Sequence, residues 1–496
     1  MRSWISHHRL LVFLILVSGI LVGLLTFWSP GLVVMLMVII GVRKLVRQWT
    51  TPEDRRFLTR LYGLAILARL VLGAVLHLWA MYDGKGSLMY GQESFDLVSG
   101  DSAYLSLRGW IMAQTWLGRF DRAALYQGLF KDQGTALVYL YAWFHTLFGF
   151  SQFAVKLVNS LFGVLTALVS YQIVKTLCGR RTASLVAVLV AFFPSLFLWS
   201  MTNLKETPSA LGLMWTCWAL IRLIRQGPRL STLGQLAGGL WLVWCARPIL
   251  LFPVGLCVLL SVWYRLLTWP GRIVVRIGAA GMLMALLWGA PMEARIDPGS
   301  FWTSKLSTVM SRLLSIQQSH LLSPGSGYRI YDDAVYQSGA QASPQFTPGR
   351  IARAWVRGVE YFLLQPVPWK PSTSLQVLSI PEMVVWYPLL GLALWGALVL
   401  WRTAGAETMV LLVPLLVLTS LMALSTGNVG IAFRHRAIVL PLYLIFSAVG
   451  IGHRLGWLRR RGGASVPLTG RPIHSCILKA LRISRHFHAE GYACIC

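Results

Sequence analysis

The chain contains repeated apolar runs, and these limit the folds open to it more than any other feature does. Most of the runs are close to the ~20 residues that cross a bilayer as an α-helix. The candidate spans are residues 10–28, 31–46, 61–81, 153–177, 183–200, 208–224, 232–246, 248–267, 273–290, 382–401, 406–425 and 437–452. Backbone groups in hydrocarbon must be satisfied within the segment, so such runs cross as helices. The sequence therefore predicts an all-α polytopic membrane protein with about 11–13 transmembrane helices.

Basic residues set the expected orientation of these spans. The net charge is +28, and most Lys and Arg residues cluster in short loops, such as Arg43–Arg60 and Arg222–Arg229. The positive-inside rule then places both termini in the cytoplasm. This placement accounts for the basic charge, and no folded basic domain is visible, so we expect no nucleic-acid partner.

The spans and polar segments predict a division of the chain into five parts. These are an N-terminal hairpin with a basic cytoplasmic loop (1–60), a transmembrane core with a first outer loop at 82–152 (61–290), an outer loop or small domain (291–380), C-terminal spans (381–452) and a basic cytoplasmic tail (453–496). Within the first outer loop, Tyr104–Trp116 and Ala136–Phe148 are amphipathic stretches too short to span. Most of the 17 carboxylates fall on the outer side, which indicates where chemistry takes place.

The first candidate site is the Gly-Asp-Ser-Ala-Tyr segment of the first outer loop. A helix that begins at Asp101 places Asp101, Tyr104, Leu105 and Arg108 on one face. A carboxylate beside an arginine at the membrane surface suits a general base that removes a proton from a sugar hydroxyl. The alternative is that Asp101 only caps the helix, since Asp is a favoured N-cap residue.

The second candidate site is the short outer connection at residues 202–208. Lys205 and Glu206 would lie at the rim of an outward-facing cavity. The alternative is again local, because Asn203 and Glu206 have capping-box spacing and Pro208 suits a first helical turn.

The third candidate site consists of Arg434 and Arg436, which we place just outside the last span. Arginines on the outer face break the charge bias of the other short loops, and Arg is suited to bidentate phosphate binding. Arg247, between two apolar runs, is a similar case, and the alternative for each is contact with lipid headgroups. Arg69, inside the third span, is interpreted as snorkelling toward the inner face.

The order of these features resembles the GT-C superfamily of polyprenyl-phosphate-sugar glycosyltransferases over about residues 60–452. The resemblance rests on the acidic first outer loop, Leu147-Phe148-Gly149, a span ending Phe193-Pro194-Ser195, the Lys205-Glu206 loop and the Arg-rich motif before a Pro441-containing span. The greatest likeness is to the bacterial branch related to protein O-mannosyltransferases and aminoarabinose transferases, the family 39-like enzymes. The chain departs from that pattern in its extra hairpin at 10–46 and in lacking a paired Asp-Glu in the first loop.

The resemblance implies a glycosyltransferase of a bacterial inner membrane that moves a sugar from a polyprenyl-phosphate carrier to a glycan, lipid or protein acceptor. It implies Asp101 as the base, with Asp96 and Asp83 as the alternatives. It also implies Glu206 as a second acid that shapes the site or holds a divalent cation with Asp101, and basic residues near the late spans as phosphate ligands. The alternatives are a polymerase or ligase that uses lipid-linked oligosaccharide and, in a different class, a lipid or solute transporter.

Overall fold

The structure of the chain is a computed structural model that describes residues 30–82, 100–119, 136–268, 298–322, 326–337, 346–369 and 374–457. Regular secondary structure in these residues is helical, with one isolated β-bridge between Gly327 and Asn428. Six described helices are long and apolar enough to cross a membrane: Pro52–Leu76, Gln152–Cys178, Glu206–Gln226, Ser379–Thr403, Gly405–Ser425 and Val429–Arg454. The predicted all-α, multi-pass membrane fold is confirmed, while the candidate spans at 10–28 and 273–290 lie outside the described residues.

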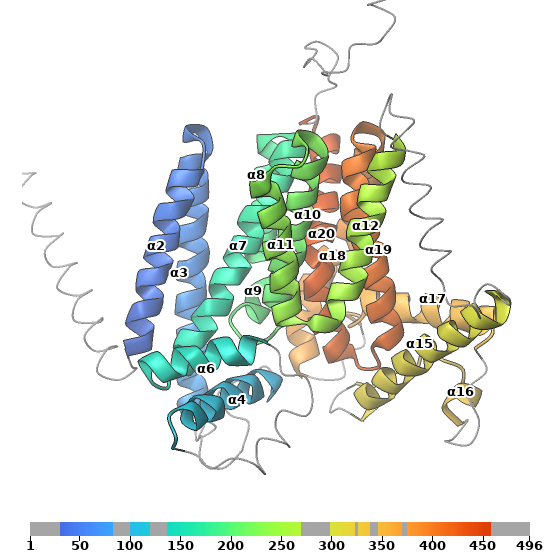
Figure 1. Cartoon of the computed structure of the whole chain (residues 1–496), viewed down its shortest axis with the longest axis horizontal. Coiled ribbons are helices and arrows are strands. Elements are labelled where there is room, and N and C mark those ends of the chain that lie inside the picture. The colour runs from blue at the N-terminus through green and yellow to red at the C-terminus, as the bar shows by residue number, and fades with distance from the viewer. Residues whose placement is uncertain are drawn as a thin grey trace, which may run out of the picture.

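Long helices stand side by side, and shorter ones gather at one end of them (Figure 1). The upright helices are α2 (Pro30–Trp49), α3 (Pro52–Tyr82), α7 (Gln152–Cys178), α8 (Arg180–Phe192), α10 (Glu206–Gln226), α11 (Leu230–Ala246), α12 (Pro248–Thr268), α18 (Ser374–Thr403), α19 (Gly405–Ser425) and α20 (Val429–Arg454). At the lower end in the view lie α4 (Gly100–Trp116), α6 (Ala136–Phe148), α9 (Pro194–Trp199), α15 (Pro298–Leu321), α16 (Asp333–Gln337) and α17 (Pro348–Leu364). The amphipathic stretches within 82–152, predicted as a first outer loop, thus form helices α4 and α6, as predicted.

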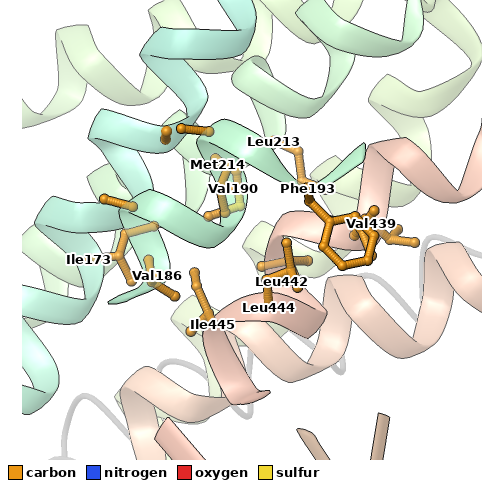
Figure 2. Packing of buried hydrophobic residues seen from close by; sticks show 14 of the residues in the cluster. Ile173, Val186, Val190, Phe193, Leu213, Met214, Val439, Leu442, Leu444 and Ile445 are labelled. Atoms are coloured by element: carbon orange, nitrogen blue, oxygen red, sulfur yellow. The ribbon is translucent and has the colours of Figure 1, made fainter. Parts of the chain in front are cut away.

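Helix α20 is the central element of the apolar core. The apolar stretch of α20 that is long enough to cross a membrane is 94% buried, whereas that of the neighbouring α18 is 33% buried. Figure 2 shows Leu442 and Ile445 of α20 packed near Val190 of α8 and Met214 of α10. An apolar helix buried on all sides has little lipid contact, so polar residues at its start face protein instead.

The predicted span at 183–200 is wrong as a single helix. Phe193 takes an extended conformation, so α8 ends there and α9 begins at Pro194, whose ring fits a first helical turn. Arg69 of α3 holds this break together: its Nη2 donates to Ala191 O at 2.8 Å and its Nε to Ser200 Oγ at 2.7 Å. Arg69 is 1% exposed, so the snorkelling interpretation is also wrong.

The opposite end of the bundle carries ion pairs between neighbouring helices. The carboxylate of Asp54 on α3 binds Lys175 of α7 and Arg180 of α8. Arg225 of α10 lies 2.7 Å from Glu407 of α19. These pairs join elements at the end where the sequence has its short basic loops.

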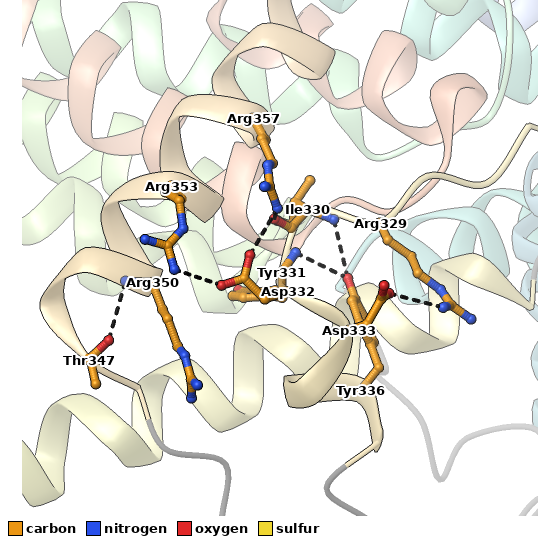
Figure 3. Close-up of polar contacts among 10 residues, drawn as sticks. All are labelled: Arg329, Ile330, Tyr331, Asp332, Asp333, Tyr336, Thr347, Arg350, Arg353 and Arg357. Carbon is orange, nitrogen blue, oxygen red and sulfur yellow. Dashed lines mark hydrogen bonds and ion pairs between the residues drawn. The ribbon is translucent and has the colours of Figure 1, made fainter.

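The described residues of 298–369 pack around α17 in a small core that also includes Leu424 and Val429. Asp332 receives hydrogen bonds from Arg353 at 2.9 Å and Arg357 at 3.1 Å (Figure 3). The hydrogen bond from Arg353 holds the pKa of Asp332 below its usual range. Tyr328 stacks on Tyr361 with ring centres 4.1 Å apart. The described parts of this segment therefore lie at the end of the bundle where α4 and α6 lie.

Candidate active site

A buried carboxylate at the start of α10 binds two arginines from other helices. Glu206 has no exposed surface, and its Oε1 lies 2.5 Å from Arg247 Nη2 and 3.1 Å from Arg434 Nε. Arg247 stands between α11 and α12, while Arg434 is in the second turn of α20. Segments far apart in the sequence thus meet at one oxygen atom.

Two predicted boundaries change at this site. Helix α20 begins at Val429, so Arg434 and Arg436 lie within the helix. The prediction that they lie outside the last span is wrong. Helix α10 begins at Glu206 with Lys205 as its N-cap residue and no side-chain capping bond. The capping-box interpretation of Asn203 is therefore wrong. Glu206 belongs to the helix end itself and faces the bundle interior.

The cluster carries more positive than negative charge. Lys205, Arg247 and Arg434 all act electrostatically on Glu206, so three cations face one carboxylate and the net charge is +2. Charges of this kind interact more strongly away from bulk water. The arrangement favours an anion, and guanidinium groups suit phosphate oxygens in particular.

Buried side chains of α7 fix the loop that leads into Glu206. Asn159 Nδ2 donates to Thr202 O at 2.6 Å and to Leu204 O at 2.8 Å, and Ser160 Oγ donates to Ser200 O at 3.1 Å. Backbone carbonyls outside a helix need partners when they are buried. The loop therefore has a defined shape before any ligand arrives.

The first turn of α4 touches the same loop. The backbone N–H of Asn203 donates to Ser102 Oγ at 2.7 Å, and Tyr141 OH of α6 donates to Asn203 O at 3.4 Å. Asp101 directly precedes Ser102, so its backbone lies beside the Glu206 loop. The side chains of Asp101 and Tyr104 lie outside the described residues, and Asp101 as the base stays a prediction. Arg108, further along α4, is 5% exposed.

Arg436 is turned away from this cluster. Its Nη1 donates to Leu363 O at 2.9 Å, and its guanidinium lies 5.3 Å from the centre of the Trp386 ring. Arg436 also interacts electrostatically with the buried Glu382 of α18. The structure brings Lys205, Glu206, Arg247 and Arg434 together, whereas Arg436 joins α17 and α18 to α20.

Two histidines at the site are absent from the sequence prediction. His435 Nε2 lies 3.9 Å from Glu206 Oε1, and the His320 ring of α15 has its centre 6.0 Å from that of His435. His435 is adjacent to Arg434 in the sequence, which was a usable signal. His320 has no local signal, because only the fold brings α15 to α20.

The described side chains do not fit a divalent cation. Within the described ranges, no three His, Cys, Asp or Glu residues gather closely enough to hold a metal ion. Glu206 Oε1 already binds two guanidinium groups, and the positive charge around it opposes a further cation. The side chain of Asp101, the other predicted ligand, lies outside the described residues.

The comparisons with known proteins agree with the class that fold and site define, a polytopic membrane protein with a buried cationic site. The family model of the dolichyl-phosphate-mannose-protein mannosyltransferases matches residues 132–291, which include Glu206 and Arg247. This match confirms the resemblance to GT-C-type membrane glycosyltransferases. No curated protein sequence matches the chain.

Among solved structures, the chain is similar to the archaeal oligosaccharyltransferase AglB from Archaeoglobus fulgidus, in complex with an inhibitory peptide and a dolichol-phosphate. The identity is 15% and the TM-score 0.38, over 84% of this chain and 54% of that one. The chain thus spans about half the length of that protein.

Proposed function

We propose that this protein is a glycosyltransferase that moves a sugar from a polyprenyl-phosphate carrier to an acceptor on the non-cytoplasmic face of a membrane. The observation that carries the proposal is the Glu206 cluster, where two arginines from different helices share one buried carboxylate oxygen. A site of net positive charge, at one end of a membrane bundle, suits a lipid-linked phosphate. The family model and the sequence resemblance support the same chemistry.

The positive charge of the cluster stabilises the departing lipid phosphate more than it stabilises the intact lipid-linked sugar donor. In the proposed reaction Asp101 takes the proton of an acceptor hydroxyl, whose oxygen attacks C1 of the sugar from the face opposite the phosphate. The bond between C1 and the phosphate oxygen breaks, and its electron pair stays on the phosphate, which leaves with inversion at C1. The phosphodiester carries one negative charge, and the phosphomonoester product carries up to two. Arg247, Arg434 and Lys205 would stabilise the charge that develops.

Glu206 has a different role from Asp101 in this proposal. Its Oε1 is held by Arg247 and Arg434, so it orients both guanidinium groups and acts as a positioning residue. It accepts a charge-assisted hydrogen bond from Arg247 Nη2. A carboxylate engaged in this way is a poor base.

A polymerase or ligase that uses lipid-linked oligosaccharide would employ the same phosphate chemistry and differs only in its substrates. A transporter would need charged groups that change partners within the bundle. Arg69 and Arg436 are buried, yet each donates to backbone carbonyls that mark helix ends. These contacts support static roles and favour the transferase over the transporter.

The test is an Asp101→Asn variant in membranes supplied with radiolabelled polyprenyl-phosphate sugar. We expect transfer to fall by about 100-fold or more, the usual contribution of a general base. Asp333→Asn is the matched control, because Asp333 is an outer carboxylate whose side chain is 74% exposed. Unchanged transfer by Asp101→Asn would remove the base assignment. Transport of lipid or solute across vesicles, with no labelled sugar consumed by the unaltered protein, would replace the proposed function.

A further inference from the structure

His435 lies within the charged cluster and points into it. Its Nε2 is 3.9 Å from Glu206 Oε1, the atom that Arg247 and Arg434 also approach. The residue is 7% exposed. An imidazole ring has an N–H that can donate to a phosphate oxygen, so a phosphate beside Arg434 would also lie within reach of His435.

The end of α15 is fixed against the turn that precedes α20. The Tyr328 backbone N–H donates to Gly427 O at 2.8 Å, and the Val429 N–H donates to Ser326 O at 3.0 Å. Gln317 of α15 is fully buried, and a Cβ on Gly427 would stand 2.6 Å from Gln317 O. Such a close approach leaves little freedom for the end of α15.

This docking brings His320 to the site. His320 lies three residues after Gln317, and its ring meets that of His435 at an angle of 65° with centres 6.0 Å apart. Hydrogen bonds to phosphate oxygens span about 2.7–3.2 Å between heavy atoms. Because the two ring centres are 6.0 Å apart, one phosphate group placed between the rings can accept a hydrogen bond from each of them.

The cluster also has an unused acceptor. Within the described part of the chain, Glu206 Oε2 is buried and has no hydrogen-bond partner. Both side-chain polar atoms of Asn203, a residue that is 1% exposed, lack partners there as well. Buried polar groups without partners are uncommon. The side-chain N–H of Asn203 can donate to a phosphate oxygen, whereas the Glu206 carboxylate oxygen can only accept and so does not bond to phosphate.

We propose that His320 of α15 contacts the carrier phosphate together with Arg434 and His435, so that α15 completes the donor site. The inference rests on the proposed function. It assigns to α15 a role in donor binding. Donor binding would therefore depend on the docking of α15 against the 427–429 turn.

The experiment measures binding of farnesyl phosphate, a short polyprenyl monophosphate, to the purified full-length protein. We expect His320→Ala to weaken binding roughly tenfold, the effect of losing one hydrogen bond to a charged group. His320→Gln retains N–H donors and should recover part of the loss. The acceptor KM should stay unchanged. His453→Ala is the control, since His453 lies near the other end of α20 and contacts Trp395.

Parallel measurements with farnesol and with inorganic phosphate separate the contributions of the lipid and the phosphate. If His320→Ala weakens farnesol and farnesyl phosphate equally, the residue only supports the fold and the proposal fails. If Arg434→Ala weakens farnesyl phosphate but His320→Ala does not, the inference fails while the proposed function stands. If neither variant nor Arg247→Ala changes binding, the phosphate site itself is refuted.

Discussion

Arg434 and Arg436 lie two residues apart on α20 and serve different partners. Arg434 Nε is 3.1 Å from Glu206 Oε1, whereas Arg436 Nη1 donates to Leu363 O at the end of α17. Residues two apart in a helix are separated by about 200° around its axis, which explains the opposite directions. One short basic motif therefore contributes both to the charged cluster and to the packing of α17.

Substitution should separate these two roles. Arg436→Ala removes one of two donors to the Leu363 carbonyl, which keeps the indole N–H of Trp386, and it also removes a donor to Gln365 O and the cation beside Glu382. We expect it to lower stability by about 3 kcal/mol, as for a buried charge deprived of its partner. Arg434→Ala should weaken farnesyl phosphate binding and change stability less. Thermal unfolding of both purified variants in detergent measures the difference, and an equal loss of stability would contradict the assignment.

Glu206→Gln tests whether Glu206 positions the arginines. The amide keeps the shape of the side chain but removes the charge that holds Arg247 and Arg434. We expect turnover to fall by about 100-fold, since preorganised charges lose their alignment. Binding of farnesyl phosphate should not weaken, because the cluster becomes more positive. A loss of binding as large as the loss of turnover would show that Glu206 contacts the ligand itself.

Much of the architecture follows from the sequence because the bilayer leaves few alternatives. Runs of apolar residues predicted α2, α3, α7, α10, α11, α12, α18, α19 and α20, and the short amphipathic stretches predicted α4 and α6. Helices α15, α16 and α17 lie in a segment predicted only as an outer loop or small domain. The ends of the helices were harder to predict from the sequence. The sequence placed Arg434 outside its span, since its charge argued against burial, yet protein contacts on α20 compensate that charge.

The site could be predicted only in part from the sequence. Lys205, Glu206, Arg247 and Arg434 were recognised separately, as charged residues near the ends of apolar runs, and the structure brings them together. His320 could not be found in this way. It depends on the pairing of Gly327 with Asn428, a contact between segments about 100 residues apart in the chain.

Stability should depend on pH through His145 of α6. Burial lowers the pKa of His145 from 6.5 to about 4, and its ring is stacked on Phe150 with centres 5.3 Å apart. The fold favours the neutral ring, so its contribution is present above pH 6.5 and is lost as the pH falls toward 4. His145→Phe should show a smaller drop in unfolding temperature between pH 7 and pH 4. His453→Phe serves as the control, and an identical drop in all three proteins would exclude His145 as the cause.

The crossing of α18 and α20 depends on two glycines without room for a side chain. A Cβ on Gly396 would stand closer than a van der Waals contact to Phe446 O, and one on Gly450 would likewise overlap Leu392 O. Both obstacles are backbone atoms, so the helices would have to separate. Gly396→Ala should therefore lower stability by about 1–3 kcal/mol, the usual effect of overpacking.

Gly391→Ala on the same helix is the matched control, because its Cβ would meet nothing within 4 Å. Since alanine favours helix over glycine, Gly391→Ala should be neutral or stabilising. Thermal unfolding of the two variants decides the matter: equal stability would mean that α18 and α20 do not cross this closely.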